Sequence, residues 1–164
     1  MSNLTRNLRD GALVIKDGSG TPKSLTLLLD EGDLSWTETL DTKEISDRGV
    51  LDHTRPGNEV SCQMDFSVKW TQLISKTVSS GQDYVVYEFL NNIGGGLTST
   101  SGTGQQFTTK HEFTVADPAG VRGELITFAK VFKNTLTLGE GDEYNTIRFS
   151  GRDFETKPVI TRSA

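Results

Sequence analysis

The sequence predicts a mainly β protein with one helix and one long charged loop. Residues 60–70 alternate apolar and polar positions, and short apolar runs elsewhere are separated by clusters of Gly, Asp and Pro. The chain of 164 residues is 34% hydrophobic and contains 17 glycines, a composition typical of many turns and polar strand faces. Successive strand side chains point to opposite faces, so the alternation predicts a half-buried strand. A chain of this length is expected to form one domain, 1–164, around one core.

The N-terminal half is predicted as an arm followed by short strands. Residues 1–10 are polar without periodicity and are expected to be an N-terminal arm. Strands are predicted at 12–16, 24–30 and 34–38, because apolar runs there end at turn-forming residues. The second and third of these fit a hairpin or a bulged strand.

Residues 41–59 are predicted to be a long extended loop. Acids and bases alternate there around few apolar residues, and loops of this length are usually functional or flexible. Arg55-Pro56-Gly57-Asn58 is predicted as a turn that leads into the strand 60–70. That strand exceeds the typical length of roughly 5–6 residues. It therefore needs long neighbours, a partner subunit or a hairpin that leaves the domain.

The C-terminal half is predicted as a helix, a loop and an antiparallel meander. The helix spans about 83–93, with Asp83 as its N-cap, apolar residues at i, i+3, i+4 and i+7, and Gly94 at its end. Residues 94–106 are expected to be a flexible Gly/Ser/Thr loop. The meander is predicted to consist of strands at 111–115, 124–133 and 144–153, with turns at 117–120 and 139–142.

Aromatic residues and the cysteine are assigned to the core. Phe66 and Trp70 are predicted to share one strand face and Phe128 and Phe132 another, while the face of Trp36 stays open. Cys62 lies on the apolar face of its strand, where a free thiol behaves as a small hydrophobic side chain.

No familiar catalytic, metal or cofactor site is predicted. Zinc needs three or four ligands, and the chain has two histidines and one cysteine, with Asp52-His53 as the only local pair. The glycines at 94–96 follow a helix instead of opening one, so the phosphate-loop geometry is missing. The acidic groups at 30–33 and 140–143 lack the spacing of a calcium loop. Solvation and turn formation are the favoured interpretations of both.

Charge and hydropathy restrict the partners. The formal net charge of −5 argues against a general nucleic-acid-binding surface. The chain has no apolar leader and no run of ~18 apolar residues, so we expect a soluble protein made inside the cell, without membrane contact. Charged residues of the 41–59 loop are exposed ion pairs of little energetic value or registration contacts with another subunit.

The order of these features resembles that of the major tail tube proteins of long-tailed, siphovirus-like bacteriophages. The resemblance covers roughly residues 11–155. It rests on the Leu-rich run before the charged segment, on Asp47-Arg48-Gly49 and Arg55-Pro56-Gly57, on the strand ending Phe66-Ser67-Val68-Lys69-Trp70, and on the helix before a closing meander.

The resemblance implies a β-sandwich or barrel-like subunit that forms hexameric rings, which stack into a tube conducting the genome. It implies no enzymatic activity and no cofactor. The partners it implies are further copies of the chain, the tape measure, tail terminator and distal tail proteins, and double-stranded DNA in transit. The location would be the virion tail, after assembly in the host cytoplasm.

By position, the resemblance makes 41–59 the loop that reaches another subunit, and the polar face of 60–70 a lumen or shared-sheet surface. The candidates for inter-subunit contact are Asp47, Arg48, Asp52 and Arg55. The candidates for the lumen or shared sheet are Ser61, Gln63, Asp65, Ser67 and Lys69. Two other classes stay open: a type VI secretion tube or tail completion ring protein, and a monomeric β-sandwich binding module or small enzyme.

Overall fold

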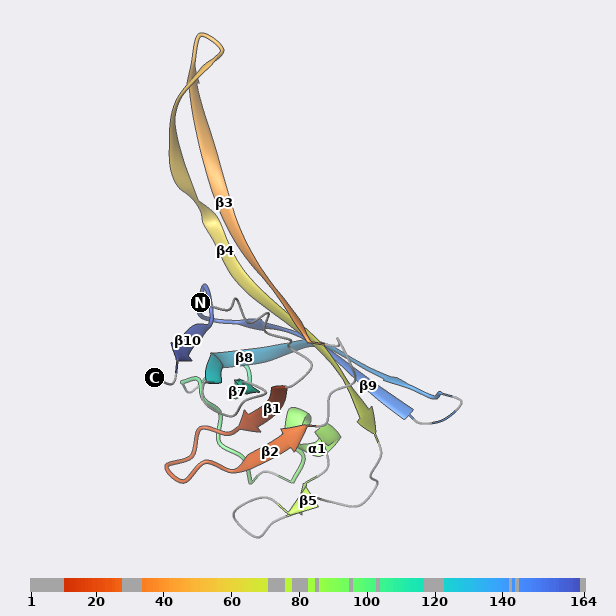
Figure 1. Ribbon diagram of the computed structural model, residues 1–164. Helices are drawn as coiled ribbons and strands as arrows, with labels where there is room; N and C mark the ends of the chain where they lie inside the picture. The colour runs from red at the N-terminus through yellow and green to blue at the C-terminus, as the bar shows by residue number, and fades with distance from the viewer. Residues whose placement is uncertain are drawn as a thin grey trace, which may run out of the picture.

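The computed structural model describes residues 11–27, 34–70, 76–77, 83–84, 86–94, 96–102, 104–116, 123–141, 143 and 145–162. Strands predominate in this part of the chain, which confirms the mainly β class (Figure 1). The elements are β1 (Gly11–Lys16), β2 (Ser24–Leu27), β3 (Ser35–Asp47), β4 (Val50–Trp70), β5 (Lys76–Thr77), β6 (Asp83–Tyr84), α1 (Val86–Asn91), β7 (Thr108–Ala116), β8 (Gly123–Gly139), β9 (Asn145–Asp153) and β10 (Val159–Arg162). No helix in these ranges is long and apolar enough to cross a membrane.

The main sheet is antiparallel and follows the order β2-β1-β7-β8-β9-β4-β3, with β10 pairing with β8 beside this path. Strands β7, β8 and β9 are consecutive neighbours, so the predicted C-terminal meander is confirmed. β8 is long enough to pair with β10 near its start and with β9 near its end. The described parts of β5 and β6 form a separate small pair.

The sheet curls over its own core. β7 and β4 are separated by β8 and β9 in the strand order, which would place them about 14 Å apart in a flat sheet. Nevertheless, the rings of Phe66 on β4 and His111 on β7 have centroids 5.8 Å apart. Trp36 on β3 likewise contacts Phe128 on β8 edge to face, at 5.8 Å. This curvature makes the subunit barrel-like, although no pairing joins β2 to β3 among the described residues.

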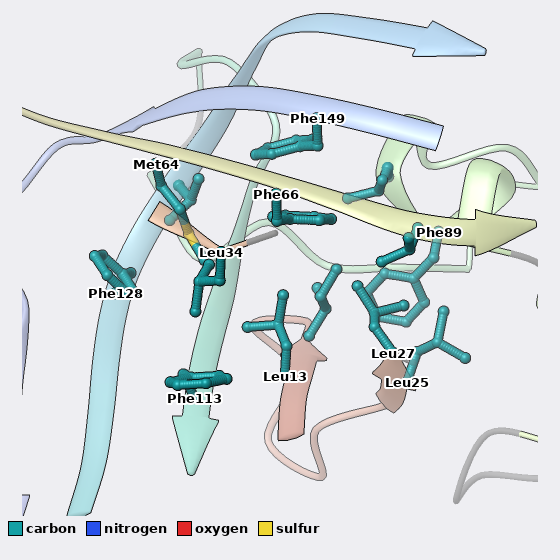
Figure 2. Packing of buried hydrophobic residues seen from close by; sticks show 14 of the residues in the cluster. Leu13, Leu25, Leu27, Leu34, Met64, Phe66, Phe89, Phe113, Phe128 and Phe149 are labelled. Atoms are coloured by element: carbon teal, nitrogen blue, oxygen red, sulfur yellow. The ribbon is translucent and has the colours of Figure 1, made fainter. Parts of the chain in front are cut away.

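One apolar cluster fills the inside of the curl. Alternate residues of each strand point inward, as in Leu13 and Ile15 of β1 and Phe66 and Val68 of β4. Figure 2 shows Phe66 and Phe149 of β9 lying face to face, with centroids 4.7 Å apart. An aromatic pair of this kind contributes about 0.5–1.5 kcal/mol beyond its buried area. The alternation of 60–70 is therefore confirmed from Cys62 to Lys69, and the thiol of Cys62 is buried.

The helix is shorter than predicted. It begins at Val86. Asp83, which was predicted to be the N-cap, belongs to β6 instead. Its end is a Schellman motif: the amide of Ile93 donates to the carbonyl of Glu88, and Asn92 adopts a φ of 52°. The left-handed residue that ends the helix is thus Asn92, and Ile93, which was expected in the core, is 46% exposed. Phe89 is buried beside the leucines of β2 (Figure 2).

Three further predictions differ from the structure. β2 pairs with β1, and β3 pairs with β4, so 24–30 and 34–38 do not form a hairpin with each other in the described residues. Phe132 does not share the core face of Phe128: β8 buries Val131 instead, and Phe132 packs on Phe154, with centroids 5.0 Å apart. β10 was not predicted, because its four residues are all exposed and carry no alternation.

Some predictions fall outside the described residues. These are the arm 1–10, the acidic group at 30–33 and the turn 117–120.

Candidate interaction surfaces

The segment 41–59 is a β-hairpin and not a loop. β3 and β4 continue past the body of the domain as a two-stranded ribbon, residues 40–60, which we call the arm (Figure 1). The strands turn at Arg48 and Gly49, whose φ angles are 50° and 83°. Positive φ at both central residues is the type I′ geometry that matches the twist of a hairpin. The exposed, charge-dense character predicted for this segment is retained, but its backbone forms two paired strands with two register shifts.

The predicted turn at Arg55-Pro56-Gly57-Asn58 is a bulge within β4. Leu40 pairs with Val60 and Thr42 with Pro56, so β4 holds extra residues opposite Asp41. A bulge accommodates proline, which cannot donate to the ladder. Gly57 packs so closely on Asp41 that a Cβ atom there would lie 2.0 Å from the Oδ2 atom of Asp41.

Apolar residues are exposed on both faces of the arm. Leu40 and Val50 are 65% and 70% exposed, and Ile45, Leu51 and Val60 are also exposed. Beyond the point where β4 leaves β9, the pairing of the described residues joins the arm strands only to each other. An isolated two-stranded ribbon is at best marginally stable in water. The arm therefore has the properties of a surface that another chain covers.

All four predicted contact residues lie on the arm. Asp47 and Arg48 are at its tip, Asp52 accepts a hydrogen bond at 2.7 Å from the Nδ1 atom of His53, and Arg55 lies directly opposite Lys43. Their role in contact between subunits stays a prediction. Lys43 was not among the predicted contact residues, because only the cross-strand register shows that it lies opposite Arg55.

The candidates for the lumen or shared sheet form the outer, polar face of β4. Ser61, Gln63, Asp65, Ser67 and Lys69 are all half-buried. The Nε2 atom of Gln63 donates to the Oδ2 atom of Asp65 at 3.2 Å, and Ser150 of β9 lies opposite Asp65. The structure places these residues together on one face, and their proposed role stays a prediction.

This face also contains two arginines that the sequence analysis did not select. Arg148 pairs with Ser67 and Arg152 with Gln63, and both arginines are exposed. On the paired stretches 61–69 and 146–152, Lys69 and these arginines face the same side as the acid Asp65. The net charge of −5 therefore does not describe this face, which is locally basic. Two residues that lie four positions apart in a strand share a face, so the spacing of these arginines is the sequence pattern from which their common face could have been predicted.

Two titratable side chains of the described core have strongly shifted pKa values. Burial lowers the pKa of His111 to about 3. Burial, with Asp153 and Glu38 nearby, raises the pKa of Cys62 to about 11, so its thiolate is scarce at neutral pH. The described residues include no group of three His, Cys, Asp or Glu side chains placed to hold a metal ion.

Comparison with known proteins shows similarity at the level of structure. No family model matches the sequence, and no curated protein matches it. A chain of the PVC sheath-tube complex, from an extracellular contractile injection system in the extended state, has a TM-score of 0.60 at 12% identity. The match covers 99% of this chain and 93% of that chain. A chain of the tube terminating cap of the anti-feeding prophage has a TM-score of 0.61 at 12% identity, covering 99% of this chain and 95% of that one.

This chain has the fold of injection-system subunits. The likeness extends over nearly the whole of each chain. It agrees with the mainly β fold of the tail tube type that the resemblance implied. The narrower assignment to a siphovirus-like phage stays a prediction.

Proposed function

We propose that this protein is a structural tail tube subunit, whose copies form hexameric rings that stack into a tube. The observation that carries the proposal is the arm. It is a two-stranded ribbon with exposed apolar residues and open edges, which are aggregation hazards in a monomer. Pairing with a neighbouring copy removes both hazards, and head-to-tail contacts that close produce rings.

The similarity of fold supports this role. One matching chain belongs to a sheath-tube complex and the other to a tube terminating cap. A conduit subunit needs a stable sheet and a polar lining, and no catalytic group. In this role the protein works in the tail, with double-stranded DNA passing through the channel and with tape measure, terminator and distal tail proteins as neighbours.

The polar face of β4 and β9 is the proposed lining of the channel. The opposite, apolar face of these two strands packs into the core, so the polar face is the one that is open to solvent. The arginines of this face would make contact with passing DNA salt-dependent, because counterions are released when cations approach phosphate.

Arm removal tests the proposal. Residues 41–59 are deleted and Leu40 is joined to Val60 through Asn-Gly, which suits a type I′ turn between two residues that already pair. The wild type is expected to form tubes in negative-stain images at high concentration. The truncated protein is expected to keep its thermal unfolding transition and to form no tubes, since the core lies outside the arm.

Two results would contradict the proposal. The first is a wild type that stays monomeric by light scattering at every concentration. The second is a truncated protein that assembles as the wild type does. As an internal control, truncated subunits mixed into wild-type protein should shorten the tubes, because they offer a docking surface without an arm.

A second candidate function is a completion or terminating ring. It is favoured by the match to the terminating cap, whose TM-score is as high as that of the sheath-tube chain. Purified protein that forms single rings without stacking at any concentration would select this alternative.

A further inference from the structure

Two cations face each other across the arm, and the one acid beside them on the same face of β3 is Asp41, two residues before Lys43. Lys43 of β3 pairs directly with Arg55 of β4, and both side chains are exposed. Like charges at directly opposite positions destabilise a ribbon. Glu44 is adjacent to Lys43 in sequence and so points to the opposite face, whereas the single carboxylate of Asp41 shares the face of the two cations and leaves this site with a net positive charge. Among the described residues, no ion pair joins either cation to an acid.

An exposed acidic turn lies at the other end of the sheet. Glu140 and Glu143 belong to the connection between β8 and β9, and both are exposed. Neither makes an ion pair within the described part of the chain. This acidic turn has a charge opposite to that of the Lys43–Arg55 pair.

The two charged sites cannot meet within one chain. β4 begins at the arm turn, where Val50 pairs with Asp47, and ends beside the acidic turn, where Trp70 pairs with Asn145. The cation site lies at Arg55 within this strand, and the stretch from Arg55 to Trp70 extends up to roughly 50 Å. Figure 1 shows the arm and the β8–β9 connection projecting from opposite sides of the body. Any contact between the sites must join different copies.

We propose that the Lys43–Arg55 pair of one subunit binds the acidic turn, Glu140 and Glu143, of a subunit in the next ring. This inference rests on the proposed function and identifies its axial contact. The two complementary sites are different and lie at opposite ends of the subunit, so the contact is head to tail. After each ring is added, the stack still has unused cation sites at one end and unused acidic sites at the other. Such a contact repeats without closing, as stacking requires. The acids also neutralise the repulsion between the two cations.

Charge exchange tests the contact. Three proteins are compared with the wild type: K43E/R55E, E140K/E143K, and all four substitutions together. Each double variant is expected to reduce the sedimentable tube fraction by roughly tenfold at low ionic strength while still forming rings. The quadruple variant keeps the wild-type net charge and re-creates the pair with exchanged signs, so tubes are expected to return. Lys157→Glu, an exposed reversal outside both sites, is the control and should leave assembly unchanged.

Each outcome separates this inference from the proposed function. Double variants that form tubes as the wild type does would overturn the contact and leave the tube proposal intact. The same holds if both double variants lose tubes but the quadruple variant, folded by circular dichroism, does not regain them. A wild type that forms neither rings nor tubes overturns both proposals.

Discussion

His111 is the most constrained polar side chain of the core. Its ring is fully buried beside the stacked pair Phe66 and Phe149, with centroids 5.8 Å and 5.5 Å away. Its Nε2 atom shares a 2.8 Å hydrogen bond with the hydroxyl of Thr109, whereas Nδ1 has no hydrogen-bond partner. Leaving a buried polar atom unpaired costs about 1–3 kcal/mol. The site therefore holds a neutral imidazole, in agreement with the low pKa.

Replacing His111 with Phe should reduce the loss in free energy of unfolding as the pH is lowered below 7. Burial lowers the folded-state pKa of His111 from 6.5 to about 3, so between these values the unfolded chain binds a proton that the folded protein does not. The stability that this neutral histidine contributes is present above pH 6.5 and is lost as the pH falls towards 3. Between pH 7 and pH 5 the free energy of unfolding of the wild type should fall by roughly 2 kcal/mol more than that of His111→Phe. Urea unfolding at pH 7 and pH 5 measures the difference.

His53→Gln is the matched control for this experiment. His53 lies on the exposed arm and outside the core, so its replacement controls for the loss of a histidine that is not buried. If His111→Phe and the wild type lost equal stability between pH 7 and pH 5, the histidine would not be the cause.

At the scale of elements, Asp17 connects the β1–β2 turn to the segment after the helix. Its Oδ1 atom accepts from the amide of Lys23 at 2.7 Å and from the Ser19 hydroxyl at 2.8 Å, and its Oδ2 atom accepts from the amide of Thr98 at 3.2 Å. The amide of Gly18 also donates to the carbonyl of Thr98 at 2.7 Å. The described part of 94–106 is thus anchored at this end. Its predicted flexibility stays a prediction.

Asp17→Ala should lower the free energy of unfolding by about 2–4 kcal/mol, because it leaves partly buried amides of two segments unpaired. Asp17→Asn keeps one acceptor oxygen and should cost less. Ser19→Ala removes a single hydroxyl bonded to Asp17 and should cost about 1 kcal/mol. Denaturant unfolding of the three variants provides the ranking, and equal losses for Asp17→Ala and Ser19→Ala would contradict it.

At the scale of the whole molecule, the curl of the sheet separates an apolar inside from a polar outside. β4 and β9 carry both surfaces, since their alternate residues point into the core and away from it. The same strands thus hold the domain together and present the proposed channel lining. A substitution on the polar face should change the lining without unfolding the domain.

Ser67→Cys tests which face lines the channel. In assembled tubes a small maleimide should label the introduced thiol, and a maleimide carried on a large protein should label only tube ends. Unassembled protein should react with both reagents, which controls for local access. Cys62 contributes little background because it is buried and its pKa is raised to about 11. Equal labelling of tubes by the large reagent would place Ser67 outside the channel.

Local sequence was sufficient to predict the elements that have one buried face. Cys62, Met64, Phe66 and Val68 alternate with polar residues, and any sheet that covers one face must bury that set. The same reasoning predicted β1 and the C-terminal meander. It did not predict the strands of the arm, because neither face of 41–59 is buried and the period-two signal is absent. β10 was missed for the same reason.

The chain by itself determined a mainly β domain, the core face of β4 and an exposed, charged segment before it. Only the tertiary structure decided that this segment is a ribbon, that Lys43 meets Arg55, and that the arm and the acidic turn lie at opposite ends of one strand. The physical reason is that burial leaves a periodic pattern in neighbouring residues, whereas cross-strand register joins residues distant in sequence. Register depends on turns, bulges and pairing along whole strands, none of which a local pattern contains.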